Sequence, residues 1–269
     1  MVAPLAPAAP FDLVLFDLDG TLLDTAPEIC DAVNDTLAHL GMPSVPLEQV
    51  VLWIGHGTLS LLAQALAHVQ GLALEQVQGS AGFAQAAQVF AGHYHQRCGS
   101  RSQPYPQVLS TLLALREHGV RLAVVTNKEH FYTERVLQAH GLLERFDLVV
   151  SGDTLPTKKP DPAGVQHCLN TLGVGRERAL FVGDSRIDVA TARHAQVAVW
   201  ALPYGYNMGE PIARSQPDRV IADCSVLLAD WTVAWPPAPR SDQLVLEQQH
   251  CAPQGHNEQP DGDVVPADE

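Results

Sequence analysis

Four short polar clusters interrupt the sequence, and each follows an apolar stretch of the chain. They are Asp17-Leu18-Asp19-Gly20-Thr21, Thr126-Asn127-Lys128, Lys158-Lys159-Pro160-Asp161-Pro162 and Gly183-Asp184-Ser185-Arg186-Ile187-Asp188. Any one of them is also typical of a turn or a capped helix start, where Asp, Asn, Ser and Thr are common for structural reasons. Four clusters at strand ends favour one shared site, because the ligand crevice of an open α/β sheet lies beyond the carboxyl ends of its strands.

The residue types in these clusters indicate chemistry on a phosphate group. Asp17, Asp19 and Asp184 would bring three carboxylates together, and these repel one another unless a cation or a bound proton joins them. Mg²⁺ suits such a set because it prefers carboxylate oxygens and retains water. Lys159 supplies positive charge in a chain of net charge −14, and Thr126 offers a hydroxyl to a phosphoryl oxygen. Together these groups neutralise a phosphate dianion, which is most of what phosphoryl transfer requires.

Alternating strands and helices are the elements that must position these clusters. Apolar runs predict buried strands over residues 12–17, 121–126, 146–151, 179–184 and 197–202. Helical stretches between them predict an α/β fold, a Rossmann-like parallel sheet core covered by helices on both faces. A long interval after the first strand shows helical periodicity alone, so we expect a helical cap domain inserted after the first core strand.

The expected domain boundaries follow from these changes of pattern. The Rossmann-like catalytic core comprises residues 11–24 and 105–235, and the helical cap comprises residues 25–104. We expect residues 1–10, which are rich in Ala and Pro, to be a disordered N-terminal segment. Residues 236–269 are rich in Pro, Gln and Asp, which predicts a disordered acidic tail without a catalytic role.

Composition narrows the class of protein. The chain has 269 residues, of which 46% are hydrophobic, and this suits a globular fold with a sizeable core. A net charge of −14 argues against nucleic-acid or anionic-membrane partners, because these bind basic surfaces. The 5 cysteines are widely spaced, which favours reduced thiols over disulfides or a zinc site. The sequence contains no apolar run of about 18 residues that would predict a membrane span. We therefore expect a cytoplasmic protein. Its oligomeric state is either a monomer or a homodimer.

In their order along the chain, the four clusters resemble the four motifs of the haloacid dehalogenase-like hydrolase superfamily. The resemblance covers residues 11–232, and the helical insertion resembles the cap that this superfamily places between motifs one and two. Further stretches resemble the bacterial members that hydrolyse 2-phosphoglycolate: Trp53–Gly57, Phe181–Arg186, Tyr204–Asn207 and Ser215–Asp218. The resemblance therefore implies a Mg²⁺-dependent phosphatase, a phosphoric monoester hydrolase that acts on this small ester.

The resemblance also implies a role for each carboxylate that matches a motif. Asp17 would attack phosphorus in line and form an aspartyl phosphate. Asp19 would protonate the leaving oxygen and then deprotonate the water that hydrolyses the intermediate. The side chains of Asp17 and Asp184, with the main-chain carbonyl of Asp19, would hold Mg²⁺.

Other residues are implied to bind the substrate or to orient the groups that do. Thr126 and Lys159 would hold the phosphoryl oxygens, with Asn127 beside them in the substrate-binding set. Asp188 would orient the metal-bound waters or Lys159. His56 lies between two glycines where related chains often have Asn, and it either reaches the carboxylate of the ester or is an exposed histidine at a helix start.

Other functions remain open at this point. Within the superfamily the chain could act on another small ester, such as a sugar phosphate, or be a sugar-phosphate mutase. The same core serves phosphatases and mutases, and the cap decides between these activities. A non-catalytic phospho-aspartate binding module would need no cap. A dinucleotide-binding protein would carry G-x-G-x-x-G after the first strand, where this chain has Asp17-Leu18-Asp19-Gly20-Thr21.

Overall fold

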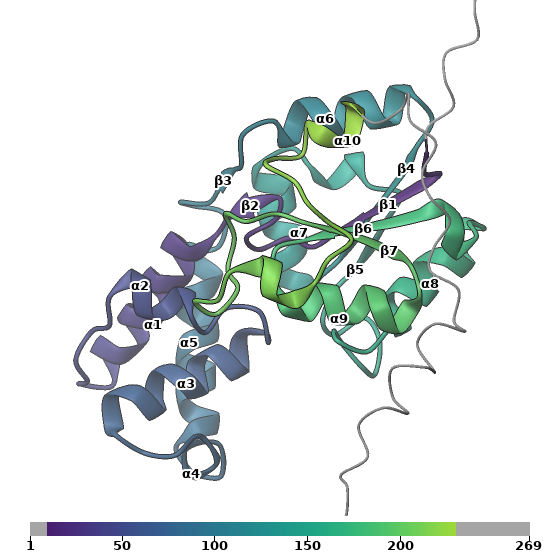
Figure 1. The fold of residues 1–269 in the computed structure, drawn as a ribbon. Coiled ribbons are helices and arrows are strands. Elements are labelled where there is room, and N and C mark those ends of the chain that lie inside the picture. Colours follow the sequence, from purple (N-terminus) through teal and green to yellow (C-terminus); the bar gives the residue numbers. More distant parts are fainter. Residues whose placement is uncertain (1–9, 230–269) are drawn as a thin grey trace, which may run out of the picture. The chain divides into compact units, whose positions relative to one another are not determined.

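A six-stranded parallel sheet forms the centre of the described chain (Figure 1). The computed structural model describes residues 10–229, and all of these belong to one compact unit of the chain, Met1–Pro236. The strand order is β5-β4-β1-β6-β7-β8, and every neighbouring pair is parallel. The bounds are β1 Leu13–Phe16, β4 Arg121–Val125, β5 Leu148–Val150, β6 Ala179–Gly183, β7 Ala198–Ala201 and β8 Arg219–Val220.

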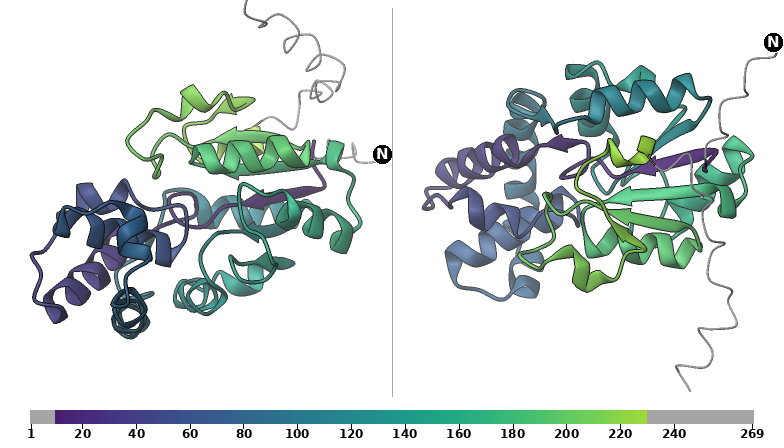
Figure 2. Two further views of the ribbon diagram at one scale, coloured as in Figure 1. Left: turned by 90° about the horizontal axis from the view of Figure 1, so that it is seen from below. Right: turned by 45° about the horizontal axis from the view of Figure 1, so that its top comes forward.

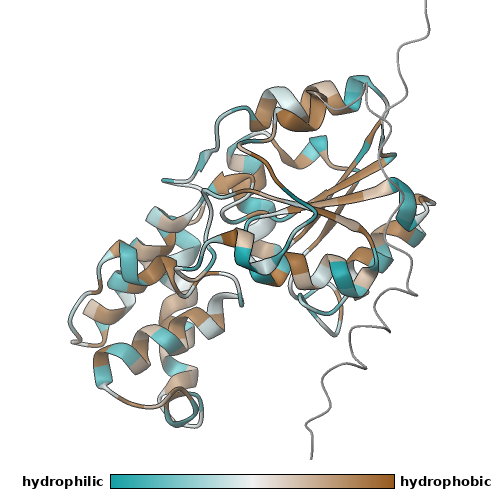
Figure 3. Cartoon of the chain, viewed as in Figure 1, coloured by the Kyte–Doolittle hydropathy of each residue, from teal (hydrophilic) through white to brown (hydrophobic). Residues whose placement is uncertain are grey.

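Both faces of this sheet are buried at the central strands β1, β4, β6 and β7, which are therefore nearly continuous apolar runs (Figure 3). In β1, Val14 and Phe16 belong to one apolar cluster, whereas Leu13 and Leu15 belong to another. Helices α6, α7 and α10 contribute to the first cluster, and α8 and α9 contribute to the second (Figure 2). Their bounds are α6 Val108–Glu117, α7 His130–Ala139, α8 Ala163–Leu172, α9 Arg186–Ala195 and α10 Val226–Ala229.

Short helical turns complete the core. Three 3₁₀ turns lie in the connections of the described chain, at Leu143–Arg145, Arg176–Arg178 and Ile212–Ser215. The loops that follow β1, β4, β5 and β6 all leave the same edge of the sheet, because parallel strands share one direction. This edge therefore brings together segments that lie more than a hundred positions apart in the sequence, and it is where the polar clusters fall.

A second group of helices lies between β1 and β4. Helix α1 packs along α5, and residues spaced by one turn, such as Ile29, Val33 and Leu37, form its buried face. Two short strands, β2 and β3, pair antiparallel, so the two segments that join these helices to the core lie side by side. The bounds are α1 Ala26–His39, α2 Leu47–Val51, α3 Thr58–Gln70, α4 Leu74–Gln78, α5 Phe83–Arg97, β2 Leu23–Asp24 and β3 Gln103–Pro104.

The fold class predicted from the sequence is confirmed: a parallel α/β core carries helices inserted after its first strand. The sequence pattern missed the short strands β2, β3 and β8, which are two residues long and carry no periodic signal. The domain boundaries at 24/25 and 104/105 stay predictions. The predictions for residues 1–9 and 236–269 lie outside the described residues. Among residues 10–229, no helix is both long and apolar enough to cross a membrane.

Candidate active site

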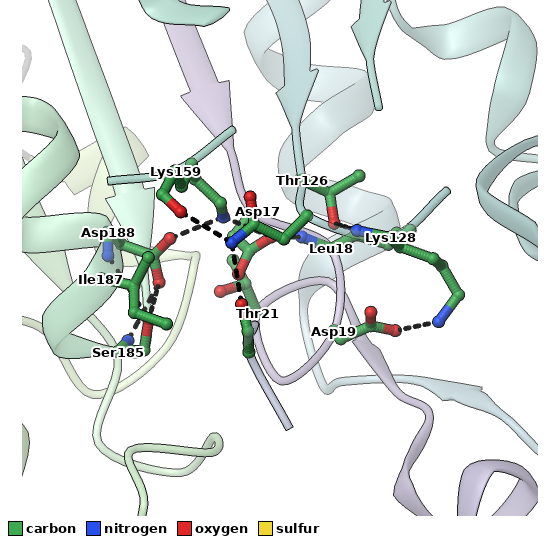
Figure 4. Close-up of polar contacts among 12 residues, drawn as sticks. Asp17, Leu18, Asp19, Thr21, Thr126, Lys128, Lys159, Ser185, Ile187 and Asp188 are labelled. Carbon is green, nitrogen blue, oxygen red and sulfur yellow. Dashed lines mark hydrogen bonds and ion pairs between the residues drawn. The ribbon is translucent and has the colours of Figure 1, made fainter. Parts of the chain in front are cut away.

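The loops at one edge of the sheet bring the predicted residues together. Asp17 directly follows β1, Thr126 follows β4 and Asp184 follows β6, while Lys159 comes from the loop between β5 and α8. Figure 4 shows Asp17 at the centre of this group, with Lys159 and Asp188 on one side and Lys128 and Asp19 on the other. All of these side chains are buried or nearly so.

Two donors contact the same carboxylate oxygen of Asp17. The Leu18 N–H donates to Asp17 Oδ1 at 2.7 Å, and Lys159 Nζ lies 2.8 Å from the same oxygen. Burial raises the pKa of Asp17 to about 7, and the Asp188 carboxylate adds to this rise while Lys159 opposes it. Within residues 10–229 both contacts engage Oδ1 and leave Oδ2 without a donor, and Asp17 lines a cavity.

Asp184 is fixed by the loop after β1 and by a second loop after β7. The Thr21 hydroxyl donates to Asp184 Oδ1, and the Tyr206 N–H donates to Oδ2. Gly20 has a φ of +87°, and a Cβ there would lie 2.4 Å from Asp184 Oδ2, so only glycine fits this turn. Burial raises the pKa of Asp184 well above its ordinary value, with further contributions from Asp188 and Asp17.

Asp188 forms an ion pair with Lys159, and its expected role in orienting Lys159 or the metal-bound waters stays a prediction. Its Oδ1 accepts from Lys159 Nζ at 2.7 Å, and its Oδ2 accepts from the N–H groups of Asp184 and Ser185 at 3.2 and 3.0 Å. Ser185 caps the N-terminus of α9, and its hydroxyl also donates to Asp188 Oδ2 at 2.6 Å. The ammonium of Lys159 therefore joins two carboxylates, those of Asp17 and Asp188.

The carboxylates of this edge suit a divalent cation. Asp17, Asp184 and Asp188 each offer an oxygen, and these three atoms lie within 4.8 Å of one another. Three buried carboxyl groups face the single ammonium of Lys159, and their mutual repulsion adds to the effect of burial in raising the pKa values of Asp17 and Asp184. Oxygen ligands without nitrogen or sulfur favour a hard cation such as Mg²⁺ over zinc. The donor set therefore fits the predicted cofactor.

Asp19 points away from this cluster and forms an ion pair that was not predicted. Its Oδ1 accepts from Lys128 Nζ at 2.7 Å and from the Thr25 hydroxyl at 2.6 Å. Burial would lower the pKa of the Lys128 ammonium, but Asp19 raises it above its usual value. The sequence placed Lys128 in the second polar cluster without a role, and its position directly after Thr126 was the only signal.

A cavity lies between this edge and the inserted helices. Its polar wall comes from the core and includes Thr126, whose Oγ1 accepts from the Lys128 N–H at 3.2 Å. Its apolar wall comes from α1, α3 and the loop before α3. The lining residues are Asp17, Asp19, Ile29, Ile54, Gly55, Gly57, Thr58, Leu61, Thr126, Asn127 and Lys128.

Polar contacts dock the loop before α3 onto the core. Asn127 Nδ2 donates to the Gly55 carbonyl at 2.9 Å and to the Lys159 carbonyl at 3.0 Å. The Thr58 hydroxyl donates to Glu129 Oε1 at 2.8 Å. The predicted substrate role of Asn127 stays a prediction, but the structure adds a second role, because its amide links the loop before α3 to the loop between β5 and α8.

His56 lies on the same loop but outside the lining of the cavity. Its side chain is exposed, but partial desolvation of the ring by its neighbours lowers its pKa, an effect strengthened by the charges of Arg186 and Lys158. The predicted contact between His56 and substrate therefore stays a prediction, and the structure places it at the rim.

Known proteins are similar to this chain in sequence and in fold. The family model for haloacid dehalogenase-like hydrolases matches residues 14–202. The chain is 40% identical to a phosphoglycolate phosphatase of Vibrio cholerae over 80% of this chain and 95% of that protein. It is 37% identical to phosphoglycolate phosphatase 1 of Pseudomonas aeruginosa, over 92% and 87% respectively. The crystal structure of a predicted phosphoglycolate phosphatase from Haemophilus somnus superposes with a TM-score of 0.76 at 34% identity, covering 82% of this chain and 97% of that one.

Proposed function

The chain belongs to the haloacid dehalogenase-like hydrolases, and on that premise we propose that it hydrolyses 2-phosphoglycolate to glycolate and inorganic phosphate. The observation that carries the proposal is the arrangement of Asp17 and Asp19 on one cavity, each with one carboxylate oxygen held and the other left for chemistry. The relatives named phosphoglycolate phosphatase, at 37% to 41% identity, support the choice of substrate.

Asp17 is the proposed nucleophile. Lys159 and the Leu18 N–H hold Oδ1, so Oδ2 attacks phosphorus in line and an aspartyl phosphate forms. The phosphoryl oxygens then lie near the Thr126 hydroxyl and the Lys159 ammonium, which offset their charge.

Asp19 is the proposed acid and base. Thr25 and Lys128 hold its Oδ1, so its Oδ2 carries the proton that the leaving glycolate oxygen takes as the ester bond breaks. The same oxygen then accepts a proton from the water that attacks the aspartyl phosphate, which releases inorganic phosphate and restores both carboxyl groups.

Mg²⁺ is the proposed cofactor. The side chains of Asp17 and Asp184 and the main-chain carbonyl of Asp19 would hold it, with Asp188 beside them. When bound, the cation offsets the negative charge of the phosphate and of the surrounding carboxylates. A cytoplasmic location and a monomeric or homodimeric state remain predictions from the sequence.

A panel of phosphate esters, assayed for released phosphate with and without Mg²⁺, tests the proposal. We expect 2-phosphoglycolate to give a higher kcat/KM than glucose phosphates, phosphoserine or nucleoside monophosphates, and activity to require Mg²⁺. A hexose phosphate that is better by about tenfold, or roughly 1.4 kcal/mol of transition-state binding, would replace glycolate as the leaving group. Absence of phosphate release from every ester would refute a phosphatase altogether.

A further inference from the structure

Lys128 places a positive charge in the wall of the cavity. The proposed mechanism uses this charge only to hold Asp19. Its side chain is 2% exposed, and its ammonium lies beside Asp19, on the opposite side of Asp17 from Lys159 (Figure 4). Lys159 already serves the phosphate end of the site through Asp17 and Asp188. Lys128 is therefore a buried cation that lines the cavity itself, whereas Lys159 contacts the lining residue Asp17 without lining the cavity.

The Lys128 ammonium keeps hydrogen-bonding capacity for a ligand. It has three N–H donors, and within residues 10–229 the one acceptor they reach is Asp19 Oδ1, at 2.7 Å. The ring of Tyr94 lies 5.2 Å from Nζ, which stabilises the charge but accepts no conventional hydrogen bond. Asp19 does not depend on this lysine alone, because the Thr25 hydroxyl also holds it at 2.6 Å.

The remaining walls restrict which ligand this ammonium can meet. On the side of the inserted helices, Ile29, Ile54 and Leu61 offer no polar group to a sugar hydroxyl. The Thr58 hydroxyl lies in the same wall, but it already donates to Glu129 Oε1 at 2.8 Å. A leaving oxygen within reach of Asp19 brings the next two carbons of its alcohol toward Lys128. In 2-phosphoglycolate, the second of those carbons is the carboxylate carbon.

We propose that Lys128 binds the carboxylate of the leaving group and thereby selects phosphate esters whose alcohol carries an anionic group attached directly to the ester carbon. This inference rests on the proposed phosphatase function and identifies what would choose its substrate. Substrate carboxylate and Asp19 share one ammonium, so the same lysine positions the acid and the leaving group. The selective charge comes from inside the cavity rather than from the rim, where His56 and Lys158 are exposed.

Two esters of nearly equal size test the inference in the wild-type protein. 2-Phosphoglycolate and carbamoylmethyl phosphate differ only in that the second has a neutral amide in place of the carboxylate. A buried charge-assisted contact predicts a preference for 2-phosphoglycolate of about 10- to 100-fold in kcat/KM. Equal kcat/KM values for the two esters would overturn the inference, and this comparison requires no variant to fold.

Lys128→Met and Lys158→Met form a matched pair of variants. Both remove one lysine near the site, but Lys128 is buried in the cavity and Lys158 is exposed at its rim. Lys128→Met should reduce the preference for the carboxylate to within about threefold of unity, whereas Lys158→Met should keep it. An equal loss on both esters in Lys128→Met, with the preference retained, would show that the lysine serves only Asp19. If p-nitrophenyl phosphate and both esters release no phosphate in the wild type, the proposed function fails as well.

Discussion

Replacing Asp184 by asparagine tests the charge argument for the carboxylate cluster without measuring activity. The Asp184 carboxylate lies within 4.8 Å of those of Asp17 and Asp188. Two like charges at such a separation repel by about 3 kcal/mol when the effective dielectric constant is about 20. Asparagine removes two repulsions, but it weakens the hydrogen bonds from Thr21 and Tyr206, which are worth about 1.5–3 kcal/mol each to a charged acceptor.

The amide oxygen of asparagine still accepts one of those bonds, which leaves a gain of about 3–4.5 kcal/mol when all three carboxylates are ionised. The raised pKa values of Asp17 and Asp184 mean that bound protons already relieve part of this repulsion in the metal-free wild type, so we expect a gain of about 2 kcal/mol. At about 2–4 °C per kcal/mol for a domain of this size, metal-free Asp184→Asn should melt about 4–8 °C above metal-free wild type. Mg²⁺ at about 100 times its Kd should stabilise the wild type by about 2.7 kcal/mol, because it binds the folded state alone. The variant should gain far less, because a ligand and a charge are gone.

Thermal unfolding by circular dichroism, in EDTA and in excess Mg²⁺, measures both effects. Asp161→Asn is the control, because its carboxylate is exposed and accepts from the Ala163 N–H, a capping contact that asparagine makes equally well. It should match the wild type in both buffers. The charge argument is refuted if metal-free Asp184→Asn melts below the wild type and Mg²⁺ raises the Tm of both proteins equally.

Three further substitutions test the proposed roles. Asp17→Asn should keep its fold by circular dichroism and lose turnover by about 10³-fold or more, because an amide cannot form an acyl phosphate; near-wild-type activity would remove Asp17 from the mechanism. Asp19→Asn should cost about 10²–10⁴ in rate on 2-phosphoglycolate and clearly less on an aryl phosphate, which leaves without a proton; equal losses would argue against an acid. Gly20→Ala should lower stability and activity more than Gly41→Ala. Both glycines have a positive φ, but only at Gly20 would the added Cβ lie 2.4 Å from a carboxylate oxygen. Equal effects of the two substitutions on stability and activity would leave backbone strain as the sole cause.

The residues at strand ends were predictable because their chemistry and their position come from the same short segment. Asp17 and Asp184 each follow a run of buried residues, and parallel strands bring such ends to one edge. Lys159 follows a short strand and a loop, and it was identified by the motif Lys158-Lys159-Pro160-Asp161-Pro162. In these cases local pattern and topology were sufficient to predict which side chains come close together.

The contacts that complete the site were not predictable, because they join segments whose relative placement no local pattern encodes. Lys128 meets Asp19 across 109 positions, and its place beside Thr126 and Asn127 is equally consistent with a solvated lysine at a helix start. The Tyr206 N–H that holds Asp184 comes from a loop after β7, where neither hydrophobic period nor charge marks a site. The contact between His56 and substrate stays a prediction: its two glycine neighbours suggested it, and the fold leaves the side chain exposed.

Catalysis and selectivity come from different parts of this chain. The carboxylates of the core and Lys159 would serve any phosphate monoester, because they engage only the phosphate and the oxygens attached to it. The walls that meet the rest of the substrate combine Ile29, Ile54 and Leu61 from the inserted helices with Lys128 from the core. Since the net charge of −14 opposes a doubly anionic ester at long range, binding must rely on charges inside the cavity, where solvent screens them least. A change of substrate would therefore require changes at the far wall and at Lys128, while the carboxylate cluster could stay as it is.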